Sequence, residues 1–289
     1  MFRDADGLTS PPEGLPATSL KDSCYFEMFA GCSNITYAPE LLATTLAEGC
    51  YQHMFHGCEN LEEAPELPVM TLAKNCYNGM FQGCDIITDT PELPATELAE
   101  GCYFQMFQGC DELVNVSDLP ATTLAKNCYW LMFRDCTKLA TAPDLPATTL
   151  AQGCYSSMFM GCTSLTSAPE ILPATTLVQS CYYQMFQGCT ELTKAPELPA
   201  AVLMDACYYG MFKGCSKLNT IKCLATNIDA SYCTNMWVDG VSSSGCFIKD
   251  PDMTAWSTGN SGIPTDWIVM NDGDTPGGGS EGTSEEEWN

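Results

Sequence analysis

The sequence predicts an α/β solenoid, in which about nine coils of 26 residues stack along one axis. The first observation is a series of cysteines that recur every 26 residues, and the second is a parallel cysteine series eight residues behind it. The third is an extended segment after each second cysteine. These patterns predict one short helix and one short parallel strand per coil, with a C-terminal cap. A solenoid binds along its length rather than in one pocket, which disfavours an enzyme.

The repeat divides the chain into three parts. Residues 1–240 carry the repeats, residues 241–270 are expected to cap them, and residues 271–289 form an acidic, Gly/Ser-rich tail that we expect to be disordered. The opening segment, from Met1-Phe2 to Leu15-Pro16, matches the second half of a repeat. We therefore expect a fragment whose missing part held an N-terminal cap and any export signal.

The charge balance excludes one large class of partner. The chain carries 36 acidic and 11 basic residues, a net charge of −25, which repels the phosphate backbone of nucleic acids. It has no apolar run of about 18 residues, so no segment is expected to insert into a membrane. We therefore expect no nucleic acid as a partner and no membrane insertion.

The helix is predicted from the segment that the two cysteines bracket. The consensus runs CYxxMFxGCxxLTxAPELPATTLAxG, and we number its first cysteine as position 0. Positions 0, 4 and 8 fall on one helical line, with the Tyr of position 1 and the Phe of position 5 beside it. Glycine at position 7 suits a helix end with a left-handed residue, and at Asp135 aspartate takes its place.

The strand is predicted from the LTxAPE segment that follows. Stacked copies would pair as a parallel sheet with about 4.8 Å between coils, and the proline would end the pairing. The LPATTL segment then turns the corner and adds a further inward leucine. One repeat carries an extra residue at Ile171, which we expect to bulge a corner without shifting the core register.

Nineteen cysteines raise three interpretations. Zinc needs four converging ligands, usually in close pairs, and this spacing with only His53 and His56 does not supply them, so we expect no metal. Disulfides between stacked coils would meet the required Cα separation and would suit an exported protein. Inward-facing columns of identical thiols are more typical of small buried apolar residues, so we expect most to be unpaired.

A column of carboxylates follows the predicted strand and is a candidate cation site. One interpretation is a row of calcium or cationic-partner sites, and the other is that each carboxylate accepts backbone N–H groups of the following corner. Because the copies look alike, a catalytic pair of unequal carboxylates is rejected. The column, preceded by Glu13, consists of Glu40, Glu66, Glu92, Asp118, Asp144, Glu170 and Glu197.

Aromatic residues at position 2 are the main candidates for ligand binding. This position is expected to point outward, yet five of the eight complete copies hold an aromatic side chain that the core does not require. The alternative is partial burial of these rings against the neighbouring coil. The candidates are Phe26, Phe104, Trp130, Tyr183 and Tyr209.

The repeat resembles the leucine-rich repeats of the BspA type. The resemblance rests on the F-x-x-C, L-x-x-x and L-P pattern with a further leucine. The CYxxMFxGC and LTxAPELPATTL motifs are similar to those of the Bacteroides repeats in particular. It covers about residues 1–240, and residues 241–270 are similar to the module that closes such arrays. The resemblance implies a curved solenoid, a cell-surface or secreted setting and adhesion to host proteins or other bacteria. It implies no catalytic residue and no cofactor.

Three functions follow from the sequence. We favour a non-enzymatic, extracellular or cell-surface adhesion module that binds a protein or glycan. The first alternative is a structural spacer within a larger surface protein, and the second is a calcium-binding scaffold. No Ser-His-Asp arrangement, phosphate loop or dinucleotide fingerprint is present in the sequence, so an enzyme is not expected.

Overall fold

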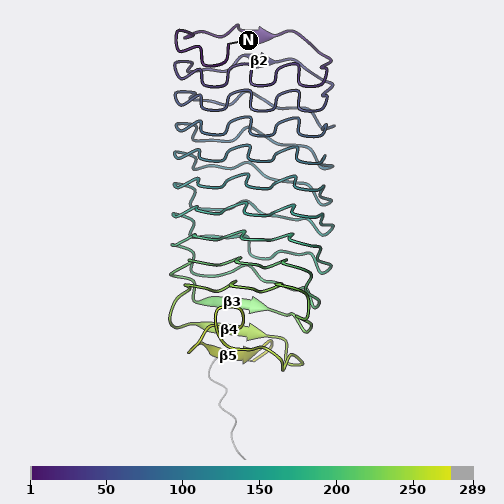
Figure 1. Cartoon of the computed structure of the whole chain (residues 1–289), viewed down its shortest axis with the longest axis vertical. Coiled ribbons are helices and arrows are strands. Elements are labelled where there is room, and N and C mark those ends of the chain that lie inside the picture. Colours follow the sequence, from purple (N-terminus) through teal and green to yellow (C-terminus); the bar gives the residue numbers. More distant parts are fainter. Residues whose placement is uncertain (1, 275–289) are drawn as a thin grey trace, which may run out of the picture.

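Successive 26-residue repeats lie on top of one another in the computed structural model, which describes residues 2–274. Figure 1 shows the repeats as layers along the long axis, from β1 and β2 at one end to β3, β4 and β5 at the other. These strands are short and span Gly14–Leu15, Glu40–Leu41, Thr220–Cys223, Cys246–Lys249 and Ile268–Asn271. All pairings between them are parallel.

The predicted helix in each coil is wrong, because the described residues contain no helix. The segment between the two cysteines is instead a run of consecutive turns, which we call the turn ribbon (24–32, 50–58, 76–84, 102–110, 128–136, 154–162, 181–189 and 207–215). N–H groups at even positions bond the carbonyl three residues back, as from Met54 to Tyr51 at 3.1 Å. N–H groups at odd positions bond the next coil, as from Phe55 to Met80 at 2.9 Å.

Positive φ angles at every fourth residue explain why a helix does not form. In one coil they occur at Gly49, His53 and Gly57, with φ values of 58°, 53° and 69°. Such left-handed residues interrupt a right-handed helix. The resulting ribbon has a period of four, with two residues inward and two outward. Over nine residues this period is hard to distinguish from the 3.6-residue period of a helix.

Coil-to-coil pairing after the turn ribbon only partly matches the predicted strands. Parallel bridges join residues 26 positions apart, such as Tyr37 to Glu63 and Thr141 to Ser167, in the predicted register. Most of them are single bridges, and named strands form only near the two ends of the stack. The parallel register is therefore as expected, whereas a strand in every coil is not.

Columns of identical aromatic side chains form the core. The tyrosines of position 1 stack face to face with ring centroids 5.6 to 6.0 Å apart. The phenylalanines of position 5 stack at 5.4 to 5.9 Å. Burial of this continuous apolar column is the main stabilising term for the stack.

The extra residue at Ile171 leaves these columns intact. Ile171 is exposed at a corner, while Tyr155 still stacks on Tyr182 at 5.7 Å and Phe159 on Phe186 at 5.6 Å. The insertion is thus accommodated outside the core, as expected from the sequence.

Tryptophans cover the C-terminal end of the apolar column. Trp237 is fully buried, stacks on Tyr208 at 6.2 Å and on Trp256 at 5.5 Å, and donates its indole N–H to the Gly262 carbonyl at 2.7 Å. Trp267 is also buried, and its indole N–H bonds the Ser242 carbonyl at 2.8 Å. The predicted tail lies, from residue 275 onward, outside the described residues.

Candidate functional site

The position-2 aromatics form an interrupted row along the outer face of the turn ribbons. Phe26 is 42% exposed, and the other four predicted candidates are partly buried. Phe104 stacks on Trp130 with ring centroids 5.0 Å apart, and Tyr183 stacks on Tyr209 at 4.8 Å. Four of the five rings are therefore partly covered by an aromatic ring of a neighbouring coil, whereas Phe26 is exposed.

A groove opens where this row is interrupted. The coil between Trp130 and Tyr183 carries Ser156 at position 2, and the missing ring leaves a hollow of about 510 Å³. Trp130 and Tyr183 both line this hollow, as do the small residues Gly153, Ser156 and Ser157 of the coil between them. The structure thus brings two of the five predicted aromatics into one binding-sized site.

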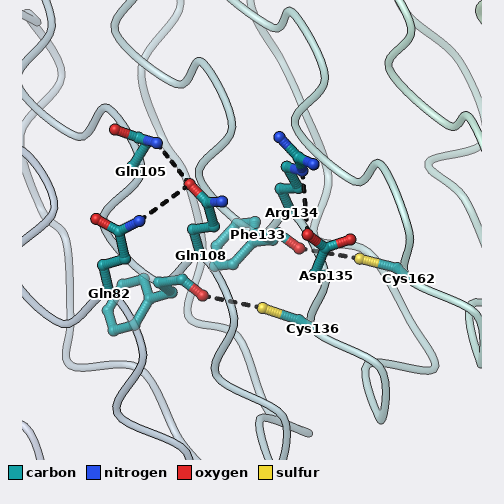
Figure 2. Close-up of polar contacts among 9 residues, drawn as sticks. Gln82, Gln105, Gln108, Phe133, Arg134, Asp135, Cys136 and Cys162 are labelled. Carbon is teal, nitrogen blue, oxygen red and sulfur yellow. Dashed lines mark hydrogen bonds and ion pairs between the residues drawn. The ribbon is translucent and has the colours of Figure 1, made fainter. Parts of the chain in front are cut away.

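The groove is lined by cations but not by carboxylates. Lys126 and Arg134 contribute to its lining, which includes no Asp or Glu. Arg134 is paired through Nε with Asp135 at 3.0 Å, so its two terminal nitrogens are not used in that bond (Figure 2). Lys126 makes no ion pair within residues 2–274. This local charge is opposite to the strongly negative charge of the whole chain.

Outward-facing amides beside the groove are bonded to one another. Gln105 donates to the Gln108 side-chain oxygen at 2.6 Å, and Gln82 donates to the same oxygen at 3.4 Å. Figure 2 shows these three amides next to Arg134 and Asp135. By contrast, the groove residue Gln184 forms no side-chain hydrogen bond with another described residue, so its amide is available to a ligand.

The carboxylate column does not assemble a multidentate site. Its members are exposed apart from Glu197, which is half-buried and bonds Lys222 at 2.9 Å. Lys222 also bonds Asp272 at 3.0 Å. Within residues 2–274, no three His, Cys, Asp or Glu side chains converge as metal ligands. The expected backbone bonds from the LPATTL corner to these carboxylates are also not observed among the described residues.

The two histidines lie beside Phe26 at the edge of the turn ribbon. Their rings are 5.7 Å apart, and the half-buried ring of His53 occupies the space above Gly79. Burial lowers the pKa of His53, and the nearby His56 lowers it further, while Glu27 opposes the shift. His53 is therefore half-buried, whereas His56 is exposed.

The cysteines are unpaired and, with two exceptions, buried. Each thiol at position 8 donates to the carbonyl of the position-5 phenylalanine in the preceding coil, as from Cys58 to Phe29 at 3.1 Å and from Cys162 to Phe133 at 3.0 Å. Figure 2 draws the Cys162 bond and the corresponding one from Cys136. The second cysteine column therefore links adjacent coils as well as filling the core.

Thiol reactivity is expected to follow this burial. Burial raises the pKa of Cys76 and of Cys128 to about 12, so the reactive thiolate is scarce at pH 8. A disulfide reagent should rapidly modify only Cys24, which is exposed, and Cys246, which is partly exposed. The Cys24→Ala and Cys246→Ala double variant should show almost no fast phase, whereas all thiols should react in denaturant. Rapid native modification of most of the 19 thiols would contradict the buried columns.

Sequence reasoning missed Ser156, Lys126 and Arg134. It singled out the aromatic copies at position 2 and gave no weight to the small residue between them. The available signal was a serine at a position flanked by Trp130 and Tyr183 in the neighbouring repeats, because a missing ring between two rings leaves a gap.

A second hollow of about 410 Å³ lies on the bridge side of the coils, beside Asp144, Glu170 and Lys194. Its lining has no aromatic side chain and has charges of both signs, so it is a weaker candidate for a binding site.

Among the described residues, no helix is long and apolar enough to cross a membrane. No protein-family model matches the chain, and no curated protein matches it significantly.

Proposed function

We propose that the stacked coils are a leucine-rich-repeat solenoid of the BspA type, and that the chain is a non-enzymatic recognition or adhesion module at a cell surface or in the extracellular space. Its partner is a protein or a glycan, bound on the outer face of the turn ribbons. The observation that carries this proposal is the groove between Trp130 and Tyr183, where aromatic walls and polar groups meet in one concave site.

The aromatic row gives this surface the properties of a recognition site. Aromatic side chains contribute large contact areas with little loss of conformational entropy, and they dominate binding energy at many interfaces. The stacked pairs also hold the groove walls in place, because Trp130 rests on Phe104 and Tyr183 rests on Tyr209. Walls that are ordered before binding reduce the entropic cost of association.

Binding to an array of mucins, matrix proteins and glycans tests the proposal. The purified chain should bind at least one component, and the Trp130→Ala and Tyr183→Ala double variant should lose about 30-fold or more in affinity, because the loss of even one hot-spot aromatic costs about 2 kcal/mol or more of binding free energy. Phe26→Ala removes an aromatic residue of the same register outside the groove, and should bind like the unmodified chain. Binding that the double variant leaves unchanged would contradict the groove as the site.

A further inference from the structure

We propose that the groove binds a pyranose ring bearing a carboxylate, as part of a glycan; this inference rests on the proposed recognition function and names its ligand class. Three features of the groove lead to it: the width between the aromatic walls, the hydroxyl groups on the floor, and the charge of the rim.

The width suits a puckered ring better than a flat one. Neighbouring rings in this row lie 5.0 and 4.8 Å apart, so removal of one ring leaves about 10 Å between Trp130 and Tyr183. A flat ring packed on both faces at carbon–carbon distances of about 3.5–4.0 Å fills only about 7–8 Å. The gap between the two walls is therefore wider than a flat ring needs. A chair-shaped sugar is thicker than a flat ring, and its C–H faces pack on aromatic rings.

The floor supplies hydroxyl groups that other side chains use little or not at all. Ser156 and Ser157 are only 6% and 4% exposed and line the groove. The Ser157 hydroxyl forms no hydrogen bond with another residue in the described part of the chain, and that of Ser156 has one long contact, 3.4 Å, with the Tyr183 carbonyl. A hydroxyl that is not committed to another side chain can both donate to and accept from a ligand with many hydroxyl groups.

The rim favours an anionic substituent. Glu100, one coil from Lys126 in the same outward column, is paired with Lys74 at 3.5 Å, which leaves Lys126 without a carboxylate partner. Arg134 keeps two terminal nitrogens beyond its bond to Asp135, and a guanidinium matches a carboxylate in bidentate geometry. The lining holds two cations and no acid, and only Arg134 has a carboxylate partner outside it, so the rim favours an acidic sugar over a neutral one.

Two matched pairs of probes test this ligand class by titration calorimetry at low salt. The first pair is sialyllactose and lactose, and the second is an oligogalacturonate and its methyl ester, so the arms separate terminal from in-chain carboxylates. At least one acidic probe should bind about 10-fold or more tightly than its neutral partner, as expected for charge-assisted hydrogen bonds. The Lys126→Gln and Arg134→Gln double variant should reduce that ratio to about one.

A space-filling variant locates the binding. Ser156→Tyr places a ring in the gap and should abolish binding of the acidic probe. The substitution should be tolerated, because Trp130 and Tyr183 already occupy this position in the adjacent coils. Asn78→Tyr is the matched control, since Asn78 is equally buried at the same position outside the groove. If Ser156→Tyr does not fold, Trp130→Ala provides the same test.

The outcomes separate this inference from the proposed function. Equal affinity for the acidic and neutral members of both pairs would overturn the carboxylate inference. If a neutral glycan or a protein from the array still bound and Ser156→Tyr abolished that binding, the proposed recognition function would stand although the carboxylate inference had failed. If the chain bound neither the probes nor any array component, both would fail.

Discussion

Replacing Phe107 with alanine is expected to lower the free energy of unfolding by about 3–5 kcal/mol. Phe107 is completely buried and stacks between Phe81 at 5.4 Å and Phe133 at 5.9 Å, near the middle of the stack. The substitution removes apolar contact on both faces of the ring and leaves a cavity that rigid neighbouring coils cannot close. Guanidinium denaturation, analysed by linear extrapolation, gives the change directly.

Phe26→Ala is the matched control for Phe107→Ala. Phe26 is an exposed phenylalanine of the same turn ribbon pattern, so its loss should change the free energy of unfolding by no more than about 0.5 kcal/mol. Similar destabilisation by the two substitutions would contradict the assignment of position 5 to the core and position 2 to the surface.

Much of the core could be predicted from the sequence because identical residues recur in register. Stacked coils place equivalent side chains over one another, so an inward residue in one coil is inward in the next. The spacing places Tyr51, Met54 and Phe55 on one face of the coil, and all three are buried. The insertion at Ile171 could be placed outside the core for the same reason, since the cysteine spacing resumes after it.

The turn ribbon could not be predicted from apolar periodicity alone. A helix and a period-four ribbon place Cys50, Met54 and Cys58 on one face over this length, so the burial pattern fits both. The distinguishing information lay in residues with left-handed φ, and in this coil glycine marks two of them, Gly49 and Gly57. His53, with a φ of 53°, adopts the same conformation without any sequence signature. Hydrogen bonds to the next coil stabilise it there.

The groove depends on a comparison between coils that a single repeat does not contain. The aromatic candidates followed from position 2, but the site arises from Ser156 between two of them. Its charge depends on which carboxylate pairs with which lysine, and the sequence alone does not determine whether Glu100 turns toward Lys74 or Lys126. Scaffold residues are thus predictable from the repeat, whereas the site lies where the repeat varies.

Replacing Trp237 with alanine is expected to lower the free energy of unfolding by about 3–5 kcal/mol, and the destabilisation should be concentrated at the C-terminal end of the stack. Trp237 is fully buried and packs between Tyr208 and Trp256. Since each coil contacts only its neighbours, the exposed end should open locally before the array unfolds. Hydrogen exchange should therefore accelerate in β3, β4 and β5 while amides near Phe107 remain protected.

Trp237→Phe separates the two contributions of this side chain. The phenylalanine variant retains a stacked ring but removes the indole donor to the Gly262 carbonyl. Its free energy of unfolding should therefore lie about 1–3 kcal/mol above that of the alanine variant. Trp267→Phe is the matched control, because the Trp267 indole makes an equivalent bond to Ser242 without lying in the central column. Uniform acceleration of exchange along the whole chain in Trp237→Ala would contradict local opening. It would indicate instead that the coils unfold as one cooperative unit, in which the aromatic columns couple the C-terminal end to the groove.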